Sequence, residues 1–463
     1  MRSAAHRTPS GTTRQSTADR LRPPFRYLMV ISAVLSLAAC DTVSDWVSGP
    51  KQEALKGKRL AVLTHSRTLT ADQAVAGKQV LLPAPTANTS WPQAGGYASH
   101  AMHHVLVRDS LAKAWSTDIG DGRDDEERLN ATPVVAGGVV FTMDALSRIS
   151  AVNAKTGKMV WDVELEPDDD DDGHIGGGIA YDDGRLFVTT GFAEAIALDA
   201  KTGKVLWRKN LISPMRAAPT ARGGRVFAVT VDNQLYALNA KTGETIWRHR
   251  GAPEVASVLG SANPAVDKGV VIVPYTSGEL VALKVENGRV LWTDTLLTAR
   301  RTDAVSSLSG IRGRPVIDRG LVIAISNAGL MVAIDMRTGR RVWDREISGL
   351  ESPWVVGDFI YVLTTDAEIA CISRKDGQIY WVRGLPRYED PEDQEDPIFW
   401  TGPVLASDRL IVAGSNGEAL AISPYNGRIL GVVEMPDGVT VAPVVADGSV
   451  YFLADDAELV AYR

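Results

Sequence analysis

The sequence predicts an all-β protein, an eight-bladed β-propeller of four-stranded antiparallel blades. Two observations predict this fold: a turn phrase that ends in Trp and a hairpin phrase that precedes it. Each phrase returns about every 45 residues, and a chain that repeats one supersecondary unit at such a period is built as an array. We therefore expect function to lie on the faces of the array.

The turn phrase places a Gly four residues before a Trp. The Gly supplies the positive φ of a tight turn, and the Trp buries a large surface between neighbouring blades. A seventh copy, PYNGRILG (424–431), has Gly431 where the Trp would stand. The six complete copies are NAKTGKMVW (153–161), DAKTGKVLW (199–207), NAKTGETIW (239–247), KVENGRVLW (284–292), DMRTGRRVW (335–343) and SRKDGQIYW (373–381), which predict Trp161, Trp207, Trp247, Trp292, Trp343 and Trp381 as structural residues.

The hairpin phrase has the form Pro-Val-Val-x-x-Gly-x-Val-Tyr-Val. Two β-branched runs joined by a short turn with Gly or Asp indicate a β-hairpin. The strand before the repeat Gly and the Trp strand then complete four strands, which is one propeller blade. The eight copies are 132–142, 178–190, 218–230, 263–275, 314–326, 352–364, 402–414 and 442–454.

Two incomplete pieces indicate how the ring closes. The C-terminal AELVAYR (457–463) supplies a third strand with no Trp strand after it, whereas LAKAWSTDIG (111–120) is a Trp strand, containing Trp115, with no hairpin before it. We expect this N-terminal strand to complete the last blade. Closure would remove the exposed sheet edges that invite aggregation, and it predicts a single propeller domain over residues 88–463.

A small residue stands six positions before each repeat Gly, which predicts a tightly packed site. The residues are Ala151, Ala197, Ala237, Ala282, Ala333, Cys371 and Ala421. At such a site Cys371 is expected to be a small core residue rather than a reactive thiol.

The composition excludes some classes of function. With 45% hydrophobic and 23% charged residues the chain has a globular balance, and a net charge of −7 argues against nucleic-acid binding. We find no nucleophile elbow, phosphate-binding Gly loop or Ser-His-Asp set in the sequence, so no catalytic residues and no enzyme activity are predicted.

The N-terminus has the pattern of a lipoprotein signal. Several Arg precede the apolar run 27–39, which ends at Cys40, and Leu37-Ala38-Ala39-Cys40 has the form of a bacterial lipobox. This predicts a signal peptide over 1–39, lipidation of Cys40, and a lipidated N-terminus and tether over 40–87. An ordinary signal peptide with a coincidental Cys is the alternative.

Three segments contain residue types that occur in metal or recognition sites. His100, His103 and His104 could hold a metal, but without Cys or carboxylates at matching spacing we expect a structural or exposed role. The acidic loop 166–174 lacks the ligand spacing of a calcium loop, so no metal site is predicted there. The charged insertion 389–397 is either a solvated loop or a recognition element.

The repeat resembles the pyrroloquinoline-quinone propeller superfamily. Quinoprotein dehydrogenases hold the quinone with calcium and typically carry a vicinal Cys-Cys disulfide; this chain has only Cys40 and Cys371, so no cofactor is expected. The lipobox, tether and eight blades are more similar to the BamB family, lipoproteins of the machinery that assembles β-barrels into the outer membrane. Another periplasmic binding propeller is the alternative, with a quinoprotein dehydrogenase as a further one.

The resemblance implies function and partners. It implies a non-enzymatic scaffold at the periplasmic face of the outer membrane that binds the POTRA domains of BamA, other barrel-assembly subunits and unfolded outer-membrane protein clients, while anchored through its lipid. In enteric bacteria an Asp at the position of Asp41 resembles a signal for the inner membrane, which leaves that membrane open.

In that family the loops entering two neighbouring blades bind BamA. ASVLGSANP (256–264) and LSGIRGRP (308–315) match these loops by register, although Gly310 and Arg312 stand where the family has acidic residues. The implied partner-binding residues are Ala256, Val258, Leu259, Gly310 and Arg312. Independently, an apolar phrase beside Arg300, Arg301, Arg312 and Arg314 is typical of a protein interface, with inter-blade packing as the alternative.

Overall fold

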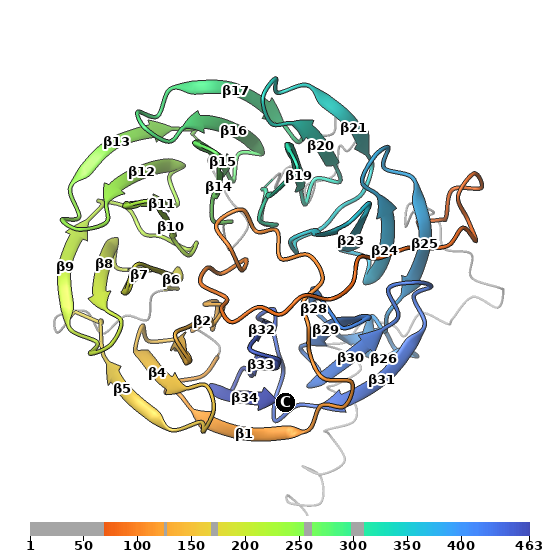
Figure 1. Cartoon of the computed structure of the whole chain (residues 1–463), viewed down its shortest axis with the longest axis horizontal. Helices are drawn as coiled ribbons and strands as arrows, with labels where there is room; N and C mark the ends of the chain where they lie inside the picture. Colours follow the sequence, from red (N-terminus) through yellow and green to blue (C-terminus); the bar gives the residue numbers. More distant parts are fainter. Residues whose placement is uncertain (1–68, 125–126, 168–174, 254–261, 298–309) are drawn as a thin grey trace, which may run out of the picture. The chain divides into compact units, whose positions relative to one another are not determined.

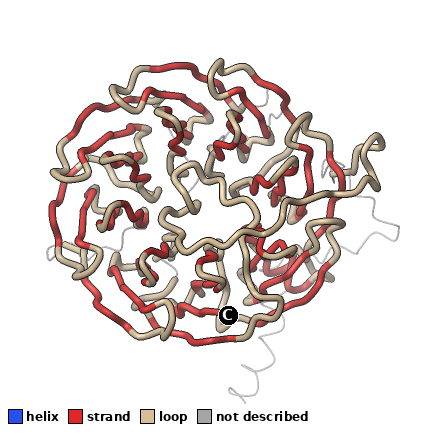
Figure 2. Tube along the Cα trace, in the orientation of Figure 1, coloured by secondary structure: helices blue, strands red, loops and turns tan. Residues whose placement is uncertain are grey.

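The protein is a closed ring of β-sheets. The structure is a computed structural model that describes residues 69–124, 127–167, 175–253, 262–297 and 310–463. Residues from Ser66 onward form one compact unit. In its described part the chain forms strands and turns without an α-helix (Figure 2). Eight four-stranded sheets surround a central channel, which confirms the predicted eight-bladed β-propeller (Figure 1).

Seven blades are continuous in sequence, and their strands run in order from the channel outward (Figure 1). Blade 1 contains β2 (Val134–Ala136), β3 (Val139–Met143), β4 (Ile149–Asn153) and β5 (Met159–Val163); blade 2 contains β6 (Gly178–Asp182), β7 (Arg185–Thr189), β8 (Glu194–Asp199) and β9 (Val205–Asn210); blade 3 contains β10 (Thr220–Arg222), β11 (Arg225–Val229), β12 (Gln234–Asn239) and β13 (Thr245–Arg250); blade 4 contains β14 (Ala265–Asp267), β15 (Val270–Pro274), β16 (Glu279–Lys284) and β17 (Val290–Thr295).

The remaining blades follow the same plan. Blade 5 contains β18 (Val316–Asp318), β19 (Leu321–Ile325), β20 (Met331–Asp335) and β21 (Arg341–Arg345); blade 6 contains β22 (Trp354–Val356), β23 (Phe359–Leu363), β24 (Glu368–Ser373) and β25 (Ile379–Gly384); blade 7 contains β28 (Trp400–Ala406), β29 (Arg409–Gly414), β30 (Glu418–Ile422) and β31 (Ile429–Glu434). The charged insertion between blades 6 and 7 forms an exposed hairpin of β26 (Tyr388–Asp390) and β27 (Glu395–Pro397).

Blade 8 joins the two ends of the propeller. It contains β32 (Val444–Ala446), β33 (Ser449–Leu453) and β34 (Glu458–Tyr462), and β1 (Lys113–Asp118) is its outer strand. β1 pairs with β34 in antiparallel register from Lys113 opposite Tyr462 to Asp118 opposite Glu458. The prediction that an N-terminal strand completes the last blade is therefore confirmed.

The small residue of each repeat faces the Trp of its own blade across the sheet. Ala151 pairs with Trp161, and Cys371 pairs with Trp381. The same pairing joins Ala197 to Trp207, Ala237 to Trp247, Ala282 to Trp292, Ala333 to Trp343 and Ala461 to Trp115. All seven small residues are 0% exposed, so the side chain opposite each indole is kept small because the space around it is filled.

Each Trp also packs against the repeat Gly of the next blade. A β-carbon at Gly203 would lie 2.7 Å from the ring of Trp161, and Gly243, Gly288, Gly339, Gly377, Gly427 and Gly157 meet Trp207, Trp247, Trp292, Trp343, Trp381 and Trp115 in the same way. Each indole Nε1 donates a hydrogen bond to a backbone carbonyl in that next blade, at 2.8 to 3.3 Å. The Trp–Gly pair is thus the joint between blades.

Gly431 lacks a Trp because the next blade has no turn to receive one. In blade 8 no turn joins the third strand, β34, to the outer strand, β1, which comes from the N-terminal side of the propeller. Where the turn would be, Arg463 N donates to the Ala112 carbonyl at 2.9 Å. No atom lies within 4 Å of a β-carbon built at Gly431. As a result the whole of β31 is exposed, and its partner Ala421 is only half-buried.

Residues 88–107 form a loop that follows the inner strands of the blades around the channel; we call this segment the collar. It is the orange trace at the centre of Figure 1. The collar hydrogen-bonds to the innermost strand of each blade, in ring order. The pairs are Asn88 with Val445, Trp91 with Val135, Pro92 with Tyr181, Gln93 with Ala221, Ala98 with Val266, Ser99 with Ile317, His103 with Trp354 and Val105 with Leu405.

Residues 69–87, within the predicted tether, lie against the ring. Val75 and Val80 are buried, and Asp72 N donates to the carbonyl of Ile379 at 2.9 Å on the outer strand of blade 6. Cys40, the predicted lipidation site, and the rest of the tether lie outside the described residues, so the lipidation and the domain boundaries at 40 and 88 stay predictions.

Candidate functional site

The structure describes only part of the predicted partner-binding site. Ala256, Val258 and Leu259, which precede blade 4, lie outside the described residues. Gly310 precedes blade 5, and its carbonyl accepts a hydrogen bond from Asn327 N at 3.2 Å. Arg312 lies two residues further on, at the mouth of the central channel.

The channel mouth opposite the collar is hollow, and we call it the axial funnel. It consists of two adjoining cavities of ≈ 470 and ≈ 80 Å³, both lined by Arg312, Leu350, Glu351, Thr401 and Thr440. Most of its walls come from the segments that join the outer strand of one blade to the inner strand of the next. These segments belong to several blades, so only the closed ring assembles the funnel.

Five arginines line the funnel: Arg123, Arg128, Arg216, Arg312 and Arg314. Arg123 forms an ion pair with Asp455 at 3.3 Å, while Arg314 Nη2 donates to Thr132 Oγ1 at 2.9 Å. Within the described part of the chain, the guanidinium groups of Arg128, Arg216 and Arg312 have no hydrogen bond or ion pair. Among the described lining residues, three guanidinium groups are therefore without a protein partner.

Arg314 spans the channel. It precedes blade 5 and reaches Thr132 of blade 1, which lies four places away in the ring of eight. Burial lowers the pKa of its guanidinium below the usual value; nearby Glu351 opposes this shift, and Arg312 adds to it. A second guanidinium held close to Arg314 is unfavourable unless a negative charge lies between them.

Glu351 is the one carboxylate among the described lining residues. Its Oε2 already accepts hydrogen bonds from Thr401 Oγ1 at 3.2 Å and from Gly402 N at 3.5 Å. Because Arg123 is paired with Asp455, one engaged carboxylate faces the four other arginines of the described lining, which is therefore cationic although the net charge of the chain is −7.

The wider part of the funnel has an apolar wall. Phe399 is 63% exposed, and Trp400 lies beside it at the start of blade 7. The other apolar residues of this wall are Leu129, Ile175, Leu350, Leu363 and Ile398. A cavity with an apolar wall and a few charged groups is typical of ligand-binding sites in proteins.

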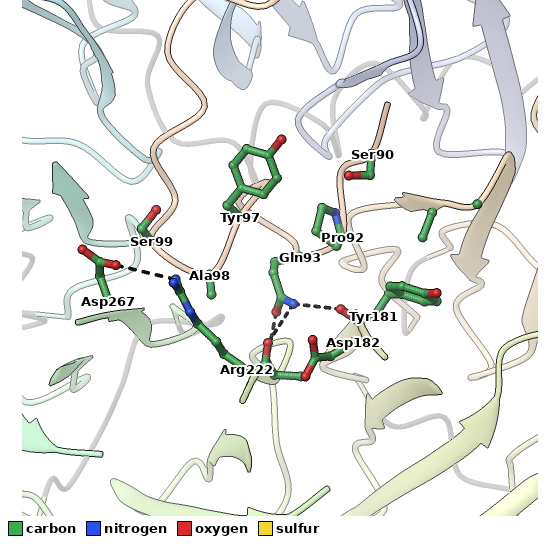
Figure 3. A pocket seen from close by; sticks show the side chains of 13 residues that line it. Ser90, Pro92, Gln93, Tyr97, Ala98, Ser99, Tyr181, Asp182, Arg222 and Asp267 are labelled. Atoms are coloured by element: carbon green, nitrogen blue, oxygen red, sulfur yellow. Dashed lines mark hydrogen bonds and ion pairs between the residues drawn. The ribbon is translucent and has the colours of Figure 1, made fainter. Parts of the chain in front are cut away.

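A second cavity, of ≈ 560 Å³, lies at the collar end of the ring (Figure 3). Collar residues Gln93 and Tyr97 line it together with Asp182 and Arg222; the Gln93 side chain points toward Tyr181, and the Tyr97 ring points away from Arg222. Arg222 Nη1 lies 3.7 Å from Asp267 Oδ1 and donates to the carbonyl of Val266 at 3.1 Å. Because its arginine is already paired, this cavity has less unsatisfied charge than the axial funnel.

Two of the three histidines, His100 and His104, hold the collar in place. His100 Nδ1 contacts the carbonyl of Pro315 at 2.7 Å, and its Nε2 lies 3.0 Å from Asn263 Nδ2. His104 bridges the carbonyl of Pro83 and Asp408 N, at 2.7 and 3.0 Å. His103 is exposed, 3.6 Å from Asp318. Two imidazoles are thus committed to structural hydrogen bonds, which confirms the expected structural role for them.

The residues of this chain do not fit a quinone–calcium centre. Cys371 is fully buried opposite Trp381, and burial raises the pKa of its thiol. It has no neighbouring Cys, and the described residues contain no group of three His, Cys, Asp or Glu placed to hold a metal ion. The acidic loop 168–172 lies outside those residues. In the described part, no helix is long and apolar enough to cross a membrane.

Sequence reasoning missed the collar and the funnel. One signal could have indicated the collar: between Lys78 and Arg108 the chain contains no Asp, Glu, Lys or Arg, which is unusual for a solvated tether. No local signal indicates the funnel, because Arg128, Arg216 and Arg312 belong to three separate connections.

The Trp–Gly joints and closed eight-bladed ring define the class as a pyrroloquinoline-quinone-like propeller. Within that class, the chain belongs to the family described as outer membrane protein assembly factor BamB, whose profile matches residues 145–383. It is 30% identical over 364 residues to the BamB of Legionella pneumophila (strain Paris), covering 77% of this chain and 89% of that protein.

Other relatives align over shorter stretches. The BamB of Escherichia coli (strain K12) is 27% identical over 203 residues, 43% of this chain and 49% of that protein. The crystal structure of BamB from Moraxella catarrhalis superposes with a TM-score of 0.65 at 20% identity, covering 76% of this chain and 100% of that one. A quinohemoprotein alcohol dehydrogenase from Pseudomonas putida HK5 gives 0.62 at 15% identity, covering 83% of each chain. At these identities, structural likeness shows the fold alone.

Proposed function

We propose that this protein is a non-enzymatic scaffold that assists the assembly and insertion of outer-membrane proteins. The observation that carries the proposal is the alignment with the Legionella relative, which covers 89% of a protein named as an outer membrane protein assembly factor. A propeller suits such a role because its rigid ring presents connecting loops on one face.

The proposal places the ring at the periplasmic face of the outer membrane, held by a lipid on Cys40, with the inner membrane as the alternative raised by Asp41. Separation of the two membranes locates the protein, and mass spectrometry of the N-terminal peptide tests for the lipid. The variant Cys40→Ala should leave the membrane fraction. Retention of that variant in the membrane would contradict the lipid anchor.

The proposed partner is BamA, bound through its POTRA domains by the connections that enter blades 4 and 5. The residues are Ala256, Val258, Leu259, Gly310 and Arg312; other barrel-assembly subunits and unfolded outer-membrane proteins complete the set of partners. The match of both connections to the family loops supports this site, as does the unpaired guanidinium of Arg312 beside it.

Affinity purification of the intact lipoprotein, with identification of BamA by mass spectrometry, tests the partner. We expect Leu259→Asp and Arg312→Glu to reduce recovery of BamA by about tenfold each, as for residues at the centre of an interface. Leu291→Asp and Arg289→Glu are matched controls, because both residues are exposed at the outer edge of blade 4. Undiminished recovery with Leu259→Asp and Arg312→Glu would exclude this site.

A further inference from the structure

We infer that the axial funnel binds the C-terminal end of an extended polypeptide. The α-carboxylate would lie among the arginines of the funnel, and the last side chain, an apolar one, would lie against the wall above them. The inference rests on the proposed function only for the source of the polypeptide, which would be an unfolded outer-membrane protein.

The unpaired guanidinium groups of the narrow cavity favour an anionic ligand. Arg216 and Arg312 line the same narrow cavity as Arg314, and neither has a protein partner among the described residues. Glu351, the carboxylate there, is engaged by Thr401 and Gly402. Planar guanidinium groups bind carboxylates with paired hydrogen bonds, so a carboxylate is the anion that this arrangement fits.

The shape of the channel selects the end of a chain. Arg314 crosses the channel to Thr132, and beyond it His100 of the collar contacts Pro315. A polypeptide that enters the funnel therefore meets a barrier and cannot thread through. The narrow cavity, ≈ 80 Å³, accommodates a small charged group, whereas a loop with two strands would need far more space.

The wall selects the residue that carries the carboxylate. The narrow cavity opens directly into the wider one of ≈ 470 Å³, where Leu363, Ile398, Phe399 and Trp400 supply apolar surface. Phe399 is 63% exposed, so a bound apolar side chain would cover surface that now faces water. A free phosphate or a short anion would use the arginines without this wall.

The test uses the full-length lipoprotein in detergent and three fluorescent Gly-Ser peptides. One ends in Phe with a free carboxylate, the second is the same peptide as a C-terminal amide, and the third ends in Ser. We expect the free Phe peptide to bind about tenfold more tightly than either of the others, by fluorescence polarisation. Equal binding of the amide would overturn the assignment of the carboxylate, and equal binding of the Ser peptide that of the wall.

Variants locate the peptide in the funnel. Arg216→Gln and Arg128→Gln remove unpaired, half-buried guanidinium groups and should abolish the preference for the free carboxylate, while Arg289→Gln, exposed at the opposite end of blade 4, should keep it. Circular dichroism shows whether each variant is folded. Retention of the preference in both folded funnel variants would exclude the funnel, as would displacement of the peptide by equimolar inorganic phosphate.

The two proposals fail separately, because Arg216 and Arg128 are not among the residues assigned to BamA. Recovery of BamA with Arg216→Gln should equal that of the unchanged protein. If the unchanged protein discriminates the peptides but recovers no BamA, the proposed function fails while the funnel assignment stands. If it recovers BamA but does not discriminate the peptides, only the funnel assignment fails.

Discussion

The indole of Trp115 packs against Gly157, so the strand that closes the last blade also joins that blade to the first. A β-carbon at Gly157 would lie 2.7 Å from the indole ring. The indole Nε1 donates to the carbonyl of Ala154 at 3.2 Å. Trp115 therefore makes the same joint as the six tryptophans that follow complete hairpins, and the ring has no weaker seam at this point.

The joints can be measured with a pair of glycines. Gly203 and Gly184 have similar φ values of 72° and 75°, but only Gly203 faces an indole. We expect Gly184→Ala to lower the free energy of unfolding by about 1 kcal/mol through backbone strain alone. Gly203→Ala should cost about 1–3 kcal/mol more because its β-carbon overlaps Trp161. Urea denaturation measures both, and equal losses would show that the indole contact contributes little.

The collar can be loosened at one side chain. Gln93 Nε2 donates to the carbonyls of Tyr181 and Ala221, and its Oε1 accepts from Ala221 N, all at 3.0 to 3.1 Å. Gln93→Ala leaves these buried backbone groups without partners, which should cost about 2 kcal/mol or more.

The control for that change is Gln234→Ala, because the side chain of Gln234 donates to the exposed side chain of Asp232, and its backbone hydrogen bonds are kept in the variant. Thermal unfolding of both variants gives the comparison. If Gln93→Ala melts at the same temperature as Gln234→Ala, the collar does not contribute to the stability of the ring.

His100 makes stability depend on pH. Burial lowers its pKa from 6.5 to about 3; the hydrogen bond to the Pro315 carbonyl opposes this shift, and the positive charge of Arg314 adds to it. As pH falls below 6.5 the unfolded chain takes up a proton that the folded chain refuses, so the free energy of unfolding decreases until the pH reaches about 3. One such group contributes about 1.4 kcal/mol per pH unit in this window.

The variant His100→Gln isolates this contribution, because the carboxylates titrate equally in both proteins. We expect its free energy of unfolding to fall less steeply between pH 6.5 and pH 4, by about one proton. Proton NMR of the imidazole should show a neutral ring at pH 5. Identical pH profiles, or a protonated ring at pH 5, would contradict the burial of a neutral His100.

The thiol of Cys371 should be inert in the folded protein. Burial raises its pKa, and 0% of the side chain is exposed. In a Cys40→Ser background, dithiobis(nitrobenzoate) should react with Cys371 at least about a hundredfold more slowly in the folded chain than in the chain in urea. Only the thiolate reacts, and in the folded chain the thiol is buried and stays protonated. Rapid labelling without urea would show that blade 6 opens readily.

Much of the fold could be predicted because short sequence motifs specify its turns and strands. Each Gly lies four residues before its Trp, so the turn and its strand are local features that repetition makes unmistakable. The closing role of Trp115 followed from counting incomplete pieces. The reason why Gly431 replaces a Trp could not be predicted, because it depends on the missing turn between β34 and β1 in blade 8.

The candidate site was predictable only in part. The sequence grouped Arg312 with Arg314 in one connection between blades, but it did not place them beside Arg216 at the channel axis. Residues 69–87 showed no periodic pattern that distinguished a free tether from a segment packed on blade 6, since buried Val75 and Val80 stand among small and polar residues with only the short apolar run Val80-Leu81-Leu82.

By itself the sequence determined the blade, the number of blades and the residues of each joint, because these depend on interactions within one repeat or with the next. Only the tertiary structure decided the collar and the axial funnel. Arg314 meets Thr132 across 182 residues of chain, and Gln93 meets Ala221 across 128. Such contacts form only when the ring closes, since closure brings connections of opposite blades, and the collar, together around one axis.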